Sequence, residues 1–187
     1  MNWNQHWNLN GKHAFLAPSQ SAWLRYSKDK LYSRWVNSKA AEEGTKKHAL
    51  ACELIKQGWK LSARKDTIAM YVNDCITDKM SPEVLLYYSD NVFGTADAIR
   101  FAEEDKALLI YDLKTGESGG LEQLEVYAAL FCLEYRKKPE DLNYILLRLY
   151  KNKDVEEENA DPLKIRAIMD TIVEMDEWLK EFKDDVI

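Results

Sequence analysis

Two carboxylates and one lysine stand in this sequence at the spacing that metal-assisted cleavage of a phosphodiester requires. Asp97 closes the segment Gly94-Thr95-Ala96-Asp97, and Asp112-Leu113-Lys114 follows it after a short variable stretch. A cation held by carboxylates can activate water, and a neighbouring lysine can counter the negative charge that develops on the phosphate. The pattern predicts a nuclease with Asp97, Asp112 and Lys114 as catalytic residues, although Asp-x-Lys by itself also fits a solvated strand end.

The surrounding residues predict two adjacent strands that position these groups. Residues 107–114 form an apolar run with a polar end, and residues 92–101 are rich in strand-forming side chains, with a polar turn between the two. Side chains alternate faces along a strand, so Asp112 and Lys114 point the same way while the leucine between them packs behind. A hairpin would bring Asp97 toward Asp112, so that the charges meet one cavity.

His48 lies in a segment, residues 41–56, that has no proline and carries apolar residues at helical spacing. The residues three, four and seven positions after it share its helical face, so its ring is expected to point inward; they are Ala51, Cys52 and Ile55. From the residues alone, two interpretations stay open. His48 is either a core histidine with satisfied hydrogen bonds or a metal ligand near the two aspartates.

Four segments, in the order expected along the chain, resemble the PD-(D/E)XK nuclease superfamily and its RecB-like exonuclease branch. Asp97 with Asp112-Leu113-Lys114 resembles the core motif of the superfamily. Gly44-Thr45-Lys46-Lys47-His48 is similar to the Gly-Thr-x-x-His signature of the branch, and Gln123 to Tyr127 is similar to its Gln-x-x-x-Tyr signature. Pro18 to Leu24 resembles the serine-rich helix start near the N-terminus of such proteins, particularly phage-associated ones.

The resemblance implies a metal site in a restriction-endonuclease-like core. It makes His48 a ligand, together with Asp97, Asp112 and the backbone carbonyl of Leu113. Such a set, rich in hard oxygen donors, suits Mg²⁺ or Mn²⁺, and the imidazole favours Mn²⁺ in vitro. Lys114 would orient the attacking water, and the products would carry 5′-phosphate ends. Relatives that hold an iron–sulfur cluster use four cysteines; this chain has three scattered ones, so no cluster is expected.

Gln123 and Tyr127 are four residues apart in a predicted helix near 120–135 and therefore share one face. Without the resemblance, the pair equally fits an amphipathic helix with an ordinary half-buried tyrosine. With it, the pair is expected to bind DNA or to order the loop that follows the catalytic strand.

The charge distribution predicts where DNA binds. Residues 1–65 carry 12 Lys and Arg against 4 Asp and Glu, a net charge of +8, whereas residues 66–187 carry 14 against 28, a net charge of -14. Basic residues of the first part interleave with aromatic ones, a mixture that can hold a nucleic-acid backbone while stacking bases. The predicted DNA-binding residues there are Arg25, Lys46 and Lys47. The alternative is a solvated helical face whose tryptophans lie in the core.

Length and pattern predict one domain, 1–187, of the α/β class with a mixed central sheet flanked by helices. It would comprise a basic helical part (1–65), a catalytic core (66–150) and a C-terminal helical part (151–187), with the site at one edge of the sheet. The expected helices lie near 19–36, 40–57, 66–79, 120–135 and 161–182, and the expected strands near 83–89, 92–101, 107–114 and 142–150.

Other features of the sequence predict the cellular compartment. No apolar run reaches the roughly 20 residues of a membrane helix, and the first residues, Met1 to Gln5, lack the charged start and apolar stretch of a secretory signal. Unpaired cysteines fit a reducing compartment. The protein is expected in the cytoplasm, without a membrane partner.

The predicted activity is a divalent-metal-dependent DNA exonuclease in phage or prophage recombination or in DNA end processing. A single-strand annealing or other recombination protein is a candidate partner. Two alternatives remain: a structure-specific endonuclease with the same catalytic residues, and a non-catalytic DNA-binding recombination partner.

Overall fold

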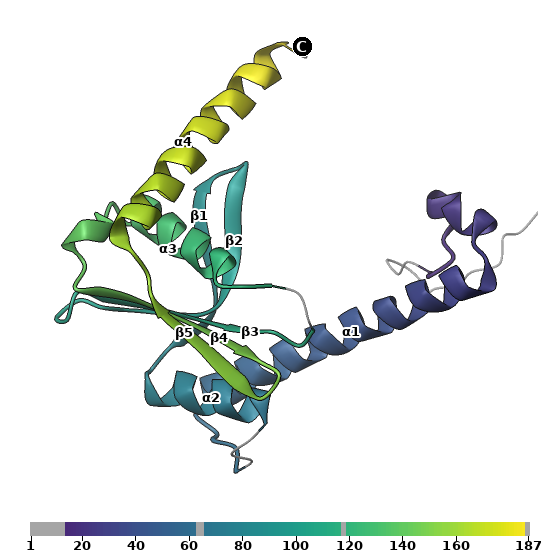
Figure 1. The fold of residues 1–187 in the computed structure, drawn as a ribbon, viewed down its shortest axis with the longest axis horizontal. Helices are drawn as coiled ribbons and strands as arrows, with labels where there is room; N and C mark the ends of the chain where they lie inside the picture. The colour runs from purple at the N-terminus through teal and green to yellow at the C-terminus, as the bar shows by residue number, and fades with distance from the viewer. Residues whose placement is uncertain (1–13, 63–65, 117–118, 186–187) are drawn as a thin grey trace, which may run out of the picture. The chain divides into compact units, whose positions relative to one another are not determined.

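A five-stranded mixed sheet forms the centre of the computed structural model, which describes residues 14–62, 66–116 and 119–185 (Figure 1). The strand order follows the chain: β1 (Ser81–Ser89), β2 (Val92–Ala102), β3 (Ala107–Leu113), β4 (Tyr144–Lys151) and β5 (Asp154–Asn159). β3 and β4 run parallel, and the other neighbours are antiparallel. The predicted α/β class with a mixed sheet flanked by helices is confirmed.

The site was predicted at one edge of the sheet, and this was wrong, because β3 is the central strand. α3 (Glu122–Glu134) and the short 3-10 helix η3 (Pro139–Asp141) carry the chain from the end of β3 back to the start of β4. This crossover lets β4 pair with β3 on the side opposite to β2. All seven residues of β3 are buried, as expected for a strand covered on both faces.

Helices cover both faces of the sheet. α3 and α4 (Pro162–Asp185) pack on one face, in a core that includes Leu108 and Ile110 of β3. α2 (Thr67–Thr77) and the end of α1 (Lys28–Gln57) pack on the other face, with Leu109 and Leu113. β3 therefore supplies alternate residues to two cores.

The chain divides into two compact units, Met1–Glu43 and Gly44–Ile187, and the division falls within the stretch 1–65 that the sequence grouped as one basic part. Two separate helices near 19–36 and 40–57 were predicted. This was wrong: a 3-10 helix, η2 (Pro18–Arg25), precedes α1, which runs unbroken from Lys28 to Gln57. No proline or glycine lies between residues 36 and 40 to interrupt it.

Several aromatic side chains of the first unit are exposed. Tyr32 and Trp35 are exposed and Trp23 is half-buried, so these residues do not support the alternative that placed the tryptophans of this part in the core. The Lys39 ammonium lies 4.8 Å from the ring centroid of Trp35, and the Lys30 ammonium lies 4.9 Å from that of Tyr26. Basic and aromatic groups are thus paired locally along this unit.

Strand β5, which holds Glu156 to Glu158, was not predicted from the sequence, where the last expected strand ended near residue 150. The residues are exposed, but they pair with β4. The turn residues Asn152 and Lys153 have φ angles of 52° and 64°, the left-handed pair that a two-residue hairpin requires. Acidic residues have low strand propensity, so only pairing with a formed β4 makes this segment a strand.

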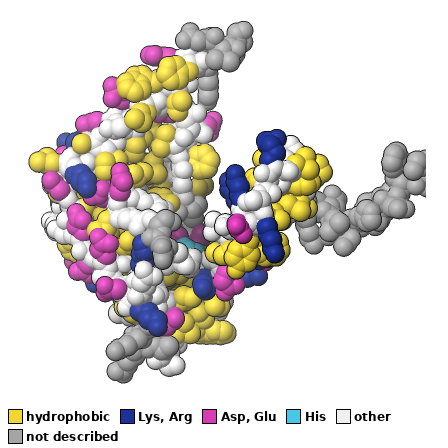
Figure 2. Space-filling model, turned by 45° about the vertical axis from the view of Figure 1, so that its right-hand side comes forward, with side chains coloured by type: hydrophobic (Ala, Val, Ile, Leu, Met, Phe, Trp, Pro, Cys, Tyr) yellow, Lys and Arg dark blue, Asp and Glu magenta, His cyan; other side chains and the backbone are white. Residues whose placement is uncertain are grey.

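The apolar residues of α4 lie in the core only in the first half of the helix. Ile165 and Met169 are buried, whereas Met175 and Leu179 are exposed, and hydrophobic side chains gather over this helix in Figure 2. Asp176, also buried, accepts hydrogen bonds from the Ser89 hydroxyl (2.7 Å) and the Asn91 amide (2.9 Å), which fixes α4 on the β1–β2 turn.

Among the described residues, none of the helices is both long and apolar enough to span a membrane. The first five residues, on which the expectation of no secretory signal depended, lie outside the described part of the chain.

Candidate metal and catalytic site

The pairing of β2 with β3 brings the two predicted aspartates together. Ala98 lies opposite Tyr111, so the antiparallel register, continued by one residue, sets Asp97 opposite Asp112. The backbone N–H of Leu113 donates to Asp97 Oδ2 over 2.9 Å. This bond holds the Asp97 carboxylate at the end of β3, so the predicted hairpin delivers the two carboxylates to one place.

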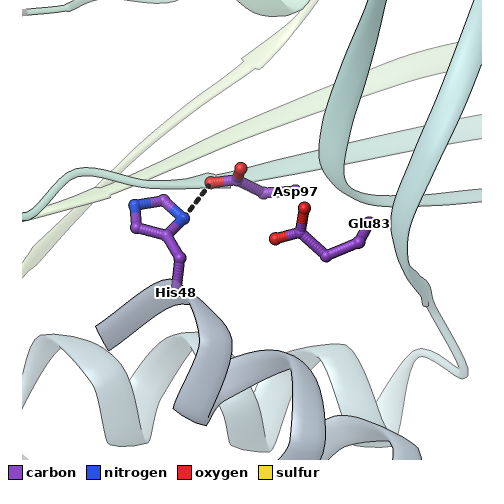
Figure 3. Close-up of side chains that lie close together, drawn as sticks. All are labelled: His48, Glu83 and Asp97. Carbon is purple, nitrogen blue, oxygen red and sulfur yellow. Dashed lines mark ion pairs between the residues drawn. The ribbon is translucent and has the colours of Figure 1, made fainter. Parts of the chain in front are cut away.

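His48 reaches the same carboxylate from α1. Its Nδ1 lies 3.3 Å from Asp97 Oδ2, and its side chain is half-buried (Figure 3). The neighbours predicted on its helical face, Ala51, Cys52 and Ile55, are buried, so the expected inward direction is correct. Leu50, an apolar residue of the same helix, is exposed. His48 thus faces the acidic group rather than closing a hydrophobic core.

A third acidic residue, Glu83, was not predicted. It lies on β1 between Pro82 and Val84, which pair with Ala98 and Ala96, so its register position is opposite Asp97. Ligand atoms of His48, Glu83 and Asp97 all lie within 4.8 Å of one another, and Figure 3 shows the three side chains converging. The only feature of the sequence that could have indicated Glu83 is its position as a charged residue in a largely apolar strand. This feature does not show which strand pairs with β1, and so it does not show that Glu83 faces Asp97.

Glu83 also has an unusual backbone conformation. Its φ of 53° falls in the left-handed region, which costs a residue with a Cβ about 1 kcal/mol or more. A strand interior normally avoids this conformation. Here it coincides with the position that faces Asp97 and His48.

Lys114 is held by partners on both sides. Its ammonium lies 2.9 Å from Asp112 Oδ2 and donates to Gln123 Oε1 over 2.6 Å. The Gln123 amide in turn donates to the Tyr127 hydroxyl over 3.4 Å. The predicted shared face of Gln123 and Tyr127 on α3 is therefore turned toward the lysine, and a polar chain runs from Asp112 to α3.

Two glycines allow this close packing. A Cβ on Gly44 would lie 2.7 Å from the Thr115 hydroxyl oxygen, so a side chain there would require either the Thr115 side chain or α1 to shift. A Cβ on Gly94 would lie 3.2 Å from the Tyr127 ring. Gly44 precedes His48 by about one helical turn, and Gly94 precedes Asp97 on β2. Both glycines thus let elements that carry site residues approach each other.

The carboxylates of the site carry more negative charge than its basic side chains neutralise. The hydrogen bond to Asp97 raises the pKa of the His48 imidazole above its usual value of 6.5. Burial, followed by the charge of Asp97, raises the pKa of Asp112. Glu83 is more exposed, and its pKa is raised by partial desolvation and then by the charge of Asp97. Crowded carboxylates of this kind favour either protons or a cation.

The donor chemistry fits a divalent cation. Asp112 Oδ2 is fully buried and, apart from its ion pair with Lys114, has no well-aligned hydrogen bond within the described residues. His48, Glu83 and Asp97 offer one imidazole nitrogen and two carboxylates, a set suited to Mn²⁺ or Mg²⁺. Among the described residues, Asp112 is not part of this close group of three. Asp112 lies beside this group, because it is opposite Asp97 in the β2–β3 register and forms an ion pair with Lys114.

We expect the affinity for Mn²⁺ to fall as the pH falls from about 8 to about 6, because protons on His48 and the carboxylates compete with the cation. The loss should reach up to about ten-fold per pH unit for each proton displaced. Calorimetric titration at several pH values, in buffers of different ionisation enthalpy, measures both the affinity and the protons released. An affinity that is independent of pH would contradict the pairing of His48 with Asp97.

The metal-free fold should show the opposite pH trend. The folded pKa of His48 lies above its unfolded value, so the ion pair with Asp97 stabilises the fold fully below about pH 6.5 and loses this contribution as the pH rises through the folded pKa. The same direction holds for Asp112 and Glu83, whose carboxyl groups are protonated more readily in the folded state. His48→Gln is the control, because it removes the histidine part of this slope.

The other predicted residues lie at three places. Leu113, predicted as a ligand through its carbonyl, donates its N–H to Asp97. Lys47 is half-buried near Lys114, and Lys46 is exposed. Arg25 ends η2 in the first unit.

The chain matches no protein-family model, no curated protein and no solved structure. A functional assignment therefore depends on the site and its sequence motifs.

Proposed function

We propose that the protein is a divalent-metal-dependent DNA exonuclease of the RecB-like branch of the PD-(D/E)XK superfamily. One observation carries the proposal: His48, Asp97, Asp112 and Lys114, which come from a helix and two strands, converge with ion-pair distances of 3.3 Å and 2.9 Å. Residues this far apart in sequence meet only through the fold. Their types are those that the sequence motifs associate with phosphodiester hydrolysis.

Asp97, Glu83 and His48 would hold the cation, with Asp112 at its side. When bound, such an ion lowers the pKa of a coordinated water and offsets charge on the phosphate. The Leu113 N–H fixes the orientation of the Asp97 carboxylate, so this ligand is oriented before the ion arrives.

Lys114 would counter the charge that develops on the phosphate and orient the attacking water. Asp112 and Gln123 hold its ammonium in place, and Tyr127 supports Gln123. Gln123 is exposed, so it can also contact the nucleic-acid strand at the site. This polar chain gives the Gln-x-x-x-Tyr pattern a positioning role toward the catalytic lysine.

Under this proposal, the sheet and its helices would form a restriction-endonuclease-like core. A mixed sheet whose central strand ends in Asp-x-Lys, with helices on both faces, supports this assignment. The exposed aromatic and basic groups of the first unit support DNA as the substrate. The proposed setting is phage or prophage recombination or end processing, with a single-strand annealing protein as a candidate partner.

The test is digestion of a labelled linear duplex, a linear single strand and a closed circle with Mg²⁺, Mn²⁺ or EDTA. We expect metal-dependent loss of linear DNA, with the circle spared and no cleavage in EDTA. Nicking of the circle would identify an endonuclease instead. Binding without cleavage under any metal would identify a non-catalytic DNA-binding protein, and neither binding nor cleavage would overturn the proposal.

A further inference from the structure

A pocket of about 460 Å³ adjoins the candidate catalytic lysine. It is lined by the end of β3 with Lys114 and Thr115, by Lys47 of α1, by Asp66 and Thr67 at the start of α2, and by Lys153 of the β4–β5 turn. Four elements thus contribute to it. The wall formed by Lys114 is shared with the catalytic site.

The pocket carries positive charge that is not neutralised internally. Lys114 is engaged by Asp112 and Gln123, but Lys47 and Lys153 make no ion pair within the described residues. Asp66 is the one acidic lining residue, and its carboxylate caps α2 by accepting the N–H groups of Ile68 and Ala69. The lysines therefore outnumber the single carboxylate at a concave surface.

Lys153 is fixed in position by its backbone. Its N–H donates to the Thr67 hydroxyl over 2.8 Å, which ties the β4–β5 turn to the start of α2. Its φ of 64° belongs to the tight hairpin turn. The turn therefore holds Lys153 at the rim of the pocket, with an exposed side chain whose length lets its ammonium reach an anion bound there.

We infer that this pocket binds a phosphate group of the nucleic-acid backbone next to the phosphate that is cut, with Lys47 and Lys153 as the contacting cations. This inference rests on the proposed nuclease function and extends it by a second phosphate subsite. Ammonium groups and hydroxyls suit an anion, and lysine binds phosphate as a point charge. The subsite would fix the register of the strand relative to Lys114 without reading its sequence.

The test compares Lys153→Ala with Lys106→Ala, which is a matched control. Lys106 is also an exposed lysine with positive φ in a hairpin turn, but it lies before the start of β3, at the end opposite to Lys114. Binding of a labelled single-stranded oligonucleotide is measured by anisotropy in EDTA, at salt concentrations from about 50 to about 200 mM. Cleavage of the same oligonucleotide is measured with Mn²⁺.

Lys153→Ala should weaken binding about five-fold at about 0.1 M salt and reduce the slope of log K against log salt by about 0.7, the value of one phosphate contact on a single strand. Lys47→Ala combined with Lys153→Ala should roughly double the change in slope. Lys106→Ala should keep the wild-type slope. Equal slopes for Lys153→Ala and Lys106→Ala in a protein that cleaves DNA would overturn the subsite alone. A wild-type protein that neither binds nor cleaves DNA would overturn the proposed function, and the subsite with it.

Discussion

Replacing Lys114 with alanine is expected to lower the rate of DNA cleavage by about 100- to 1,000-fold at saturating metal, while DNA binding persists. Its ammonium lies beside Asp112 and is held by Gln123, so it is already oriented before the substrate arrives. Charge that is positioned in advance stabilises a transition state most effectively, because no reorganisation is needed during the reaction. Single-turnover cleavage of a labelled linear duplex measures the loss.

The stability of this variant needs a separate measurement. Lys114 opposes the rise in the pKa of buried Asp112, so its removal favours the protonated carboxyl group. Thermal unfolding and DNA anisotropy show whether the variant is folded and still binds. Lys106→Ala, at the other end of β3, is the matched control and should cleave as wild type does. Wild-type turnover by folded Lys114→Ala would exclude a catalytic role for this lysine.

Gln123→Ala tests the support of the lysine. Gln123 accepts a hydrogen bond from Lys114 and donates one to Tyr127, so the variant should cleave more slowly than wild type but faster than Lys114→Ala. A loss as large as that of Lys114→Ala would show that Gln123 contacts the reacting groups itself.

Asp97→Asn is expected to weaken Mn²⁺ binding by more than about 100-fold, which exceeds the usual effect of changing a group that only orients a ligand. Asp97 is the centre of the site: it faces His48, lies opposite Glu83 and accepts the Leu113 N–H. Asparagine can still accept from Leu113, so the fold should persist while the charge is lost. Calorimetric titration with Mn²⁺ measures the affinity, and cleavage should fall in parallel.

Glu83→Gln is the comparison that tests the cluster of three ligands. Glu83 is exposed, so its loss should leave the fold intact. If it binds the cation with His48 and Asp97, Mn²⁺ affinity should fall by about ten-fold or more, though less than in Asp97→Asn. An unchanged affinity would remove Glu83 from the ligand set, and an unchanged affinity in Asp97→Asn would overturn the proposed metal site.

Local patterns predicted several elements well. The apolar run of β3 and the alternation of Asp112, Leu113 and Lys114 follow directly from strand geometry. The four-residue spacing of Gln123 and Tyr127 placed them on one helical face, and the helix predicted near 66–79 is α2, which Asp66 caps in the structure. In each case the determining contacts lie within a few residues of one another in the chain.

The tertiary structure decided what depends on distant partners. Glu83 joins the site because β1 pairs with β2 in one particular register, and β5 exists because β4 offers it hydrogen bonds. β3 is central because α3 returns the chain to its free side. The sequence by itself determined the candidate residues other than Glu83 and the faces of their own elements that they occupy. Long-range strand pairing and packing decide which of these residues meet. The free energy of these contacts depends on residues distant in the chain, so it cannot be inferred from a local sequence pattern.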